Sequence, residues 1–171
     1  MQVEGGETVK KIIVYAIVIV LLFGGLYAVN VASGGSDDNP YGIREGKLSA
    51  DTRKLLDDPL YQNIILPDEL KTRLSEGYTG FVYFFSASCV FCKQTTPVLK
   101  PMADELGVDL PMFNLLEFPE GWQEYGITHT PTLVYFKDGV EADRIVGGVE
   151  LEEGDGGVPR DVFRAFLSSR P

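Results

Sequence analysis

The two cysteines of the chain, Cys89 and Cys92, are separated by only two residues, and no other cysteine occurs in the sequence. An apolar aromatic run ends at Phe85, and a helical pattern begins just after the first cysteine. The unpaired N–H groups and the positive dipole at the start of a helix lower the pKa of a thiol, and the thiolate is the form that attacks a disulfide. We therefore predict a redox dithiol with Cys89 as the nucleophile. Cys92, one helical turn further on, is predicted to resolve the mixed disulfide.

Two other interpretations compete with a redox dithiol. One is a structural disulfide without turnover, although so short a loop constrains the unfolded chain little. The other is a metal site built from Cys89, Cys92 and His129, the single histidine. A structural zinc ion usually takes four protein ligands, and this set offers three.

The sequence on either side of the cysteines predicts a strand before them and a helix after them. Phe81 to Phe85 carries no charge and predicts a strand covered on both faces, at the centre of a sheet. A helix is expected from about Val90 to Leu106, with a kink at Pro97.

The other elements alternate in type along the chain. Pro67 marks a helix start and Gly77 a stop. Asp138-Gly139 between two apolar runs predicts a hairpin turn. The further predicted elements are strands over 61–66 and 111–116, a short helix over 121–125, hairpin strands over 132–136 and 140–146, and a final helix over 159–169. We expect that last helix to face the core with Val162, Phe163, Phe166 and Leu167. The order β-α-β-α-β-α-β-β-α indicates an α/β fold.

Length and charge limit the possible functions. The 171 residues allow one domain of ordinary size plus appendages. The formal net charge is -10, and basic residues form no cluster. Phosphate binding needs clustered Lys and Arg, so the sequence argues against a nucleic-acid partner.

An uncharged apolar run covers Ile12 to Ala32 and follows Lys10 and Lys11. About twenty helical residues span a bilayer core, so we predict a single transmembrane helix over 12–32. The lysines on its N-terminal side predict a cytoplasmic segment over 1–11 and a C-terminal domain outside the cytoplasm. A signal peptide cleaved after the run is the alternative, and it places the domain in the same compartment.

Two regions follow this run. Gly, Ser, Asp and Asn are frequent after the run, so we predict a linker with a possible short helix over 33–60. The folded domain is expected over 61–171.

The ordered set of motifs resembles the thioredoxin superfamily, and more closely its membrane-anchored, extracytoplasmic bacterial members. The motifs are Cys89-Val90-Phe91-Cys92 after an aromatic strand, Pro97 in the next helix, the segment 125–132 and the hairpin segment 136–139. The resemblance covers roughly 63–167. It implies a thioredoxin fold, a central mixed β-sheet flanked by helices with the N-terminal transmembrane helix appended. It also implies a cis peptide between Thr130 and Pro131 that faces the cysteines, with the backbone of Thr130 pairing with an extended substrate segment.

Several positions depart from the family pattern. Ser88 stands where thioredoxin has a tryptophan, Tyr83 where it has a buried acid, and Met112 where it has the lysine partner of that acid. The proton relay of cytosolic thioredoxin is therefore missing from these positions. Val90-Phe91 matches neither the dipeptide of a typical reductant nor that of a strong oxidant, and the loop 152–157 is longer than the usual turn.

The resulting prediction is a membrane-tethered thiol–disulfide oxidoreductase that acts on exported proteins and needs no cofactor. A membrane redox partner is expected to reset its dithiol. Overall resemblance to thioredoxin favours reduction slightly over oxidation. The alternatives are a non-catalytic binding or chaperone module of the same fold, and a copper or zinc chaperone that uses Cys89, Cys92 and His129.

Overall fold

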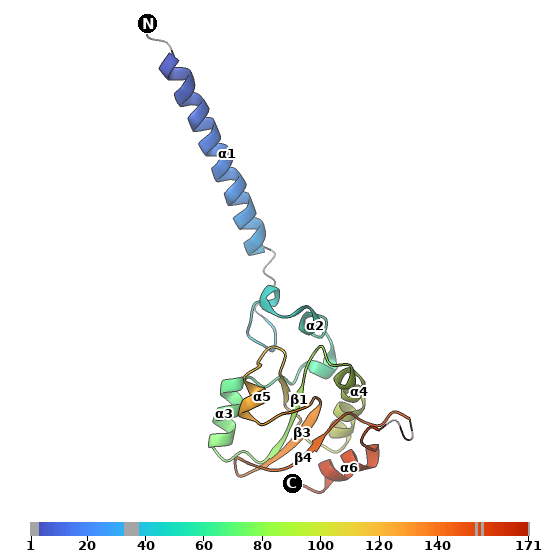
Figure 1. The fold of residues 1–171 in the computed structure, drawn as a ribbon. Coiled ribbons are helices and arrows are strands. Elements are labelled where there is room, and N and C mark those ends of the chain that lie inside the picture. Colours follow the sequence, from blue (N-terminus) through green and yellow to red (C-terminus); the bar gives the residue numbers. More distant parts are fainter. Residues whose placement is uncertain (1–3, 33–37, 153, 155, 171) are drawn as a thin grey trace.

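A four-stranded mixed sheet forms the centre of the domain in the computed structural model, which describes residues 4–32, 38–152, 154 and 156–170 (Figure 1). The strands lie in the order β2-β1-β3-β4, and β2 runs parallel to β1 whereas β3 and β4 are antiparallel to their neighbours. The strands are β1 (Gly80–Phe85), β2 (Met112–Asn114), β3 (Thr132–Lys137) and β4 (Val140–Val146). The predicted α/β fold with a mixed sheet is confirmed.

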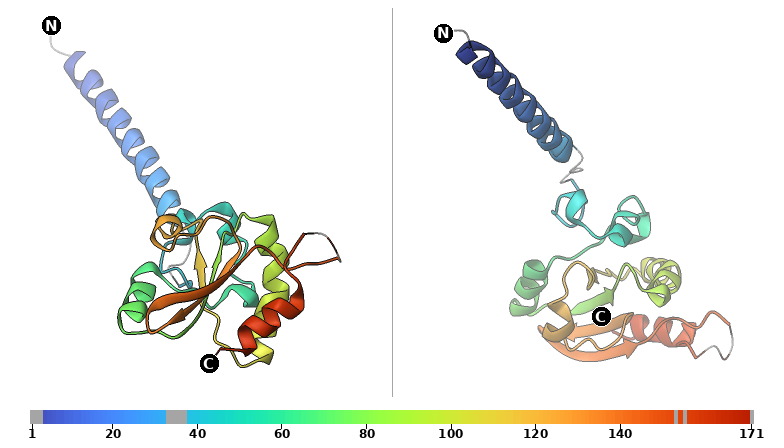
Figure 2. Two further views of the ribbon diagram at one scale, coloured as in Figure 1. Left: turned by 60° about the horizontal axis from the view of Figure 1, so that its bottom comes forward. Right: turned by 45° about the horizontal axis from the view of Figure 1, so that its top comes forward.

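Helices cover both faces of this sheet (Figures 1 and 2). On one side lie α3 (Pro67–Ser75) and α5 (Gly121–Glu124), and on the other lie α4 (Val90–Glu105) and α6 (Arg160–Ser168). The long α4 contains Pro97 and Pro101 within its helical span.

The central strand β1 connects the two layers through the alternation of its side chains. Phe81, Tyr83 and Phe85 pack in the cluster that includes residues of α4 and α6. Val82 and Phe84 pack in the cluster that includes residues of α3. Each of these five side chains is at most 2% exposed, and burial of each contributes about 1.5–3 kcal/mol. The strand therefore fixes the point at which the cysteine-bearing segment leaves the sheet.

One predicted strand is wrong. Residues 61–66 contain only a single parallel bridge, between Ile64 and Met112. The reason is local: Asp58 caps a 3₁₀ helix, η2 (Pro59–Tyr61), by accepting a hydrogen bond from Leu60 N–H, and α3 already begins at Pro67. Too few residues remain between these helices to form a ladder.

The C-terminal helix faces the core as expected at three of four positions. Phe163, Phe166 and Leu167 are buried, whereas Val162 is 44% exposed, so its predicted burial is wrong. Val162 lies in the first turn of α6, on the exposed side of that helix.

Much of the predicted linker over 33–60 is packed against the domain. We call residues 38–58 the N-terminal cap; it contains the 3₁₀ helix η1 (Glu45–Lys47) and the short helix α2 (Ala50–Arg53). Tyr41 and Leu48 belong to the core cluster on the α3 side and are 4% and 3% exposed. The short helix predicted as possible within 33–60 corresponds to α2, whereas the expected open linker is corrected from residue 38 onward. Residues 33–37 lie outside the described part of the chain.

The helix α1 (Glu4–Ala32) precedes the cap, with its side-chain exposure described over 10–24. Over the portion that the structure describes, no helix combines the length and apolarity needed to cross a membrane. The predicted transmembrane helix over 12–32 is thus not confirmed, and the side chains at 25–32 lie outside the described residues.

Candidate active site

Cys89 caps the N-terminus of α4. Its backbone is extended, with φ -76° and ψ 124°, and its sulfur accepts a hydrogen bond from the N–H of Cys92 at 3.4 Å. The same thiol donates to the carbonyl oxygen of Thr130, also at 3.4 Å. The sulfur therefore lies where free helix N–H groups and the helix dipole favour a negative charge.

Cys92 lies one turn into α4 and is 1% exposed, and both cysteines are free thiols. It belongs to the core cluster on the α4 side, which also contains Tyr83, Phe85 and Leu99. The partly exposed sulfur of Cys89 is thus the one that a protein substrate reaches first.

The two thiols differ in acidity. Partial burial acts to raise the pKa of Cys89, but hydrogen bonds with the side chains of Thr130 and Cys92 and with the backbone of Cys92 and Phe91 outweigh it, so the pKa lies below the usual value. Burial raises the pKa of Cys92 to about 12, and the adjacent Cys89 adds to the shift. The environment therefore favours a thiolate at Cys89 and a protonated thiol at Cys92.

A cis peptide joins Thr130 and Pro131 and lies against the first cysteine. The carbonyl of Pro131 accepts from Gly147 N–H at 2.9 Å, and the hydroxyl of Thr132 donates to the carbonyl of His129 at 2.8 Å. These bonds fix the loop to the end of β4 and leave the Thr130 backbone beside the sulfur. The structure thus brings together four of the predicted site residues, the two cysteines, Thr130 and Pro131.

His129 does not complete a metal site in the described residues. Its ring is exposed, and Nδ1 lies 3.1 Å from the Thr128 hydroxyl. Among the described side chains, no group of three or more His, Cys, Asp or Glu is arranged to hold a metal ion.

Hydroxyl groups surround Cys92 in place of a buried acid. Tyr83 is 1% exposed, and its phenol oxygen lies 3.4 Å from Thr96 Oγ1. Thr96 donates its one hydroxyl hydrogen to the backbone carbonyl of Cys92 at 2.9 Å. Burial raises the pKa of Tyr83 well above its usual value, so the phenol is neutral. The buried polar side chains of the described residues are hydroxyls and one amide, with no carboxylate or lysine among them.

A groove of about 610 Å³ runs beside the cis-proline loop. Its apolar walls include Phe91, Val146 and Leu151, which are 64%, 43% and 42% exposed. Gly148 forms part of the floor, and a Cβ there would lie 3.0 Å from Thr95 Oγ1. The groove can therefore receive apolar side chains of a segment bound next to Cys89.

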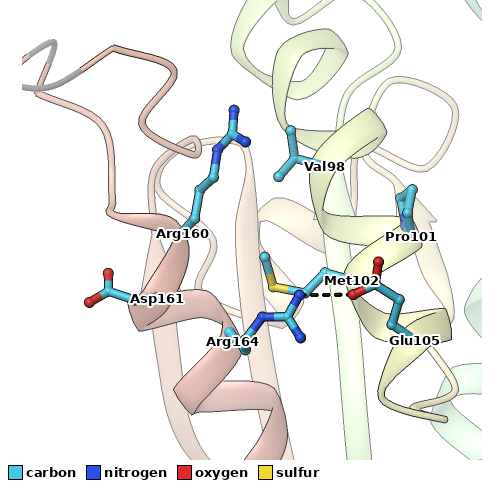
Figure 3. Close-up of a pocket in the computed structure, with 7 residues that line it drawn as sticks. All are labelled: Val98, Pro101, Met102, Glu105, Arg160, Asp161 and Arg164. Atoms are coloured by element: carbon cyan, nitrogen blue, oxygen red, sulfur yellow. Dashed lines mark hydrogen bonds and ion pairs between the residues drawn. The ribbon is translucent and has the colours of Figure 1, made fainter.

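A second cavity lies between the later turns of α4 and the start of α6 (Figure 3). It is lined by Val98, Met102 and Arg160 among others, and Arg164 and Glu105 form an ion pair across it at 2.8 Å. It contains no cysteine, so it is separate from the redox site.

Sequence reasoning missed two contacts beside the dithiol. Lys93, which follows Cys92 in the sequence, lies 3.7 Å from the carboxylate of Asp51 in the N-terminal cap. Asn114, at the end of β2, contacts both the cap and the turn before Cys89. Neither contact follows from local periodicity, because each joins segments distant in sequence.

The family model described as Thioredoxin matches residues 65–154, just over half of the chain. The chain belongs to the thioredoxin family. The thioredoxin of Chlamydia caviae is 42% identical over 72 residues, which cover 40% of this chain and 71% of that protein. The thioredoxin of Chlamydia muridarum is 35% identical over 85 residues, which cover 49% of this chain and 82% of that protein. These thioredoxins support thiol–disulfide oxidoreductase activity at the level of the family.

Solved thioredoxin structures show the same fold. Malassezia sympodialis thioredoxin matches with a TM-score of 0.51 and 24% identity, over 63% of this chain and 88% of that one. Fasciola hepatica thioredoxin matches with a TM-score of 0.50 and 22% identity, over 64% and 96%. This thioredoxin-family chain therefore keeps the fold, while Tyr83 occupies the position at which the sequence comparison expected an acid.

The acidity difference predicts selective alkylation. Iodoacetamide should modify Cys89 first, with a pH midpoint below the ordinary cysteine value of about 8.5, because the thiolate is the reactive form. Cys92 should stay unmodified at neutral pH, since it is buried and its pKa is about 12. Mass spectrometry of the alkylated peptides over a pH series measures the extent of modification of each cysteine.

The Cys92→Ala variant is the matched control. It removes the Cys92 thiol, whose hydrogen bond lowers the pKa of Cys89, and leaves no side-chain donor in its place, so the midpoint of Cys89 alkylation should rise. Equal modification of both cysteines in the unaltered chain, or a midpoint at or above that of a free cysteine, would contradict the assigned roles.

Proposed function

We propose that this protein exchanges disulfides with protein substrates through its Cys89-Val90-Phe91-Cys92 dithiol, with Cys89 as the nucleophile and Cys92 as the resolving cysteine. The observation that carries the proposal is the position of the Cys89 sulfur. It caps α4 and touches the Thr130 carbonyl, and the buried Cys92 lies one turn away.

In the reducing direction the reaction has two displacement steps. The Cys89 thiolate attacks one sulfur of a substrate disulfide, a bond forms between Cys89 and that sulfur, and the second substrate sulfur leaves as a thiolate and takes up a proton. Cys92 then attacks the Cys89 sulfur, which releases the first substrate sulfur and leaves a Cys89–Cys92 disulfide. Two electrons pass to the substrate, and the same steps in reverse oxidise a substrate dithiol.

The second step depends on deprotonation of Cys92 without a buried base. In the free dithiol, the neighbouring Cys89 contributes to the raised pKa of Cys92. Formation of the mixed disulfide removes the negative charge of Cys89, which lowers the pKa of Cys92 at the moment when it must attack. The substrate thiolate that leaves in the first step can accept the proton of the Cys92 thiol, which allows Cys92 to attack in the second step.

The cis-proline loop and the groove are the proposed substrate-binding surface. Thr130 and Pro131 present their backbone beside the nucleophile, and an extended segment around a substrate cysteine can lie along it. Phe91 and Leu151 then contact apolar side chains of that segment. Such segments are accessible in unfolded or loosely folded proteins, which suits newly exported chains as substrates.

Two considerations bear on the direction of electron flow. Hydrogen bonds that stabilise the Cys89 thiolate stabilise the reduced dithiol, and this favours oxidation of substrates. The thioredoxin relatives favour reduction. We propose reduction as the main direction, with a membrane dithiol protein as the partner that resets the Cys89–Cys92 disulfide.

We further propose that the apolar run at 12–32 anchors the protein in the cell membrane by a single pass, with the C-terminal domain outside the cytoplasm. The run is uncharged, α1 extends through it, and its apolar side chains from Ile12 to Phe23 are exposed rather than packed on the domain. Lys10 and Lys11 precede the run and favour a cytoplasmic N-terminus.

Activity assays test the enzyme proposal. The full chain should accelerate reduction of insulin by dithiothreitol, and Cys89→Ser should abolish the acceleration because no nucleophile remains. Cys92→Ser should instead accumulate covalent adducts through Cys89, since the resolving thiol is missing. Non-reducing electrophoresis and mass spectrometry detect these adducts.

Oxidation of a reduced, unfolded substrate should be measured in parallel to determine the direction. If the full chain is no faster than Cys89→Ser in either assay, the oxidoreductase proposal is wrong. Absence of trapped partners with Cys92→Ser would support the binding-module alternative, and stoichiometric copper or zinc would support the metal-chaperone alternative.

Fractionation tests the anchor. The full chain should remain with membranes after alkaline extraction, and an Ile17→Lys, Leu21→Lys double variant should shift toward the soluble fraction, because each lysine costs about 2.5–3.5 kcal/mol at the centre of a spanning helix. Protease added outside the cytoplasm should reach the domain. A full chain extracted as readily as the variant would contradict membrane anchoring, and a mature chain that begins after Ala32 would indicate a cleaved signal.

A further inference from the structure

Asn114 is a completely buried amide whose hydrogen-bonding capacity is fully used. Its Nδ2 donates to the Tyr41 hydroxyl at 3.0 Å and to Thr52 Oγ1 at 3.1 Å. Its Oδ1 accepts from the N–H of Ala87 at 3.3 Å and of Leu116 at 3.1 Å. The amide thus joins two segments that are far apart in the sequence.

One side of this junction is the N-terminal cap. Thr52 is 0% exposed, and its hydroxyl accepts a hydrogen bond from Ser49 Oγ at 2.9 Å. The backbone N–H of Ser49 donates to Glu117 Oε1 at 3.0 Å, just beyond β2. The cap is therefore held at a defined position, so its hydroxyls are presented to Asn114 in a fixed orientation.

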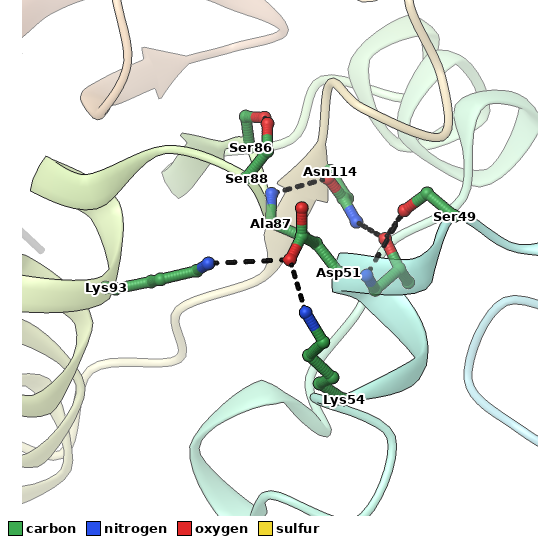
Figure 4. Close-up of polar contacts among 9 residues, drawn as sticks. Ser49, Asp51, Lys54, Ser86, Ala87, Ser88, Lys93 and Asn114 are labelled. Atoms are coloured by element: carbon green, nitrogen blue, oxygen red, sulfur yellow. Dashed lines mark hydrogen bonds and ion pairs between the residues drawn. The ribbon is translucent and has the colours of Figure 1, made fainter.

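The other side is the turn Ser86–Ser88 that leads into the dithiol. Figure 4 shows Asn114 between this turn and the cap, with Ala87 N–H directed at its side chain. The carbonyl of Ser86 accepts from Cys89 N–H at 3.0 Å. A backbone hydrogen bond from Ser86 also acts to lower the pKa of Cys92. The position of the turn therefore influences both cysteines.

A second contact joins the same two regions. Asp51 of the cap lies 3.7 Å from Lys93 Nζ and 3.0 Å from Lys54 Nζ (Figure 4). Lys93 follows Cys92 directly, and its backbone N–H donates to the carbonyl of Cys89 at 3.2 Å. This ion pair is partly exposed and contributes little by itself, so the buried amide is the main link.

We propose that the N-terminal cap is a positioning element of the active site, and that it acts through Asn114 to hold the Ser86–Ser88 turn in the geometry that Cys92 needs to resolve the mixed disulfide. The proposal rests on the proposed function. Thr52 and Asn114 are positioning residues, since neither touches the reacting sulfurs. The consequence is that the segment next to α1 influences the rate of the second chemical step.

A chromogenic aromatic disulfide separates the two steps in the full chain. Attack by Cys89 releases one coloured thiolate, and resolution by Cys92 releases a second. Thr52→Val keeps the side-chain shape but removes the hydroxyl, so one Nδ2 hydrogen of Asn114 loses its partner. We expect the second phase to slow by roughly three- to tenfold, the effect of one buried hydrogen bond, and the first phase to change less than twofold.

Matched variants identify the hydroxyl as the cause. Thr52→Ser keeps the hydroxyl and should restore the second phase. Lys54→Ala removes an exposed ion pair of the cap without touching Asn114 and should leave both phases unchanged. Tyr41→Phe removes the other acceptor of Nδ2 and should act in the same sense as Thr52→Val, so the test does not depend on one variant folding.

The pH dependence provides a readout that loss of stability alone would not change. In Thr52→Val the second phase should recover toward the rate of the unaltered chain as pH rises, because deprotonation of Cys92 then no longer depends on the turn. Folded Thr52→Val and Tyr41→Phe with an unchanged second phase would overturn the positioning role. Absence of the first phase in the unaltered chain would instead contradict the proposed function.

Discussion

The hydrogen bond from the Cys92 N–H to the Cys89 sulfur is the interaction on which the site depends. It exists because Cys89 is the N-cap residue of α4, and Cys89 follows the buried aromatic end of β1 at Phe85 by four residues. The same placement brings the sulfur against the Thr130 carbonyl at the cis peptide. A partly exposed cysteine with a lowered pKa and a buried cysteine with a raised pKa therefore lie one turn apart, an arrangement suited to sequential attack.

The absence of a buried acid near the cysteines, among the described residues, bears on the proposed second step, the attack by Cys92 on the mixed disulfide, more than on the proposed first attack by Cys89. Cys89 keeps the helix N-terminus that stabilises its thiolate. Cys92 has neutral hydroxyls around it, including the phenol of Tyr83 and the hydroxyl of Thr96. Burial raises the pKa of Cys92 most, a backbone hydrogen bond at Ser86 acts to lower it, and the neighbouring Cys89 raises it further. The positioning role proposed for Asn114 would act on this second step, through its hydrogen bond to the Ala87 N–H in the turn.

Local patterns in the sequence were enough to predict the central part of the fold. The uncharged run at 81–85, the helix from Val90 and the Asp138-Gly139 turn all correspond to observed elements, because each depends on neighbouring residues. The cis peptide at Thr130–Pro131 followed from the family resemblance, since no local pattern specifies it. The expected strand at 61–66 did not form because η2 ends at Tyr61 and α3 begins at Pro67. Only Ile64 between these two helices forms a β-bridge, with Met112.

The N-terminal cap was the main feature that local patterns did not reveal. Its polar, glycine-rich start is typical of a linker, and the burial of Tyr41 and Thr52 depends on partners more than sixty residues away. The most direct test of the account as a whole is equilibration of the full chain with defined glutathione mixtures, with the state of both cysteines determined by mass spectrometry. The account predicts one reversible two-electron transition between two free thiols and a Cys89–Cys92 disulfide. A chain that ends as a stable glutathione adduct at Cys89 with Cys92 still free, or that remains unoxidised, would contradict it.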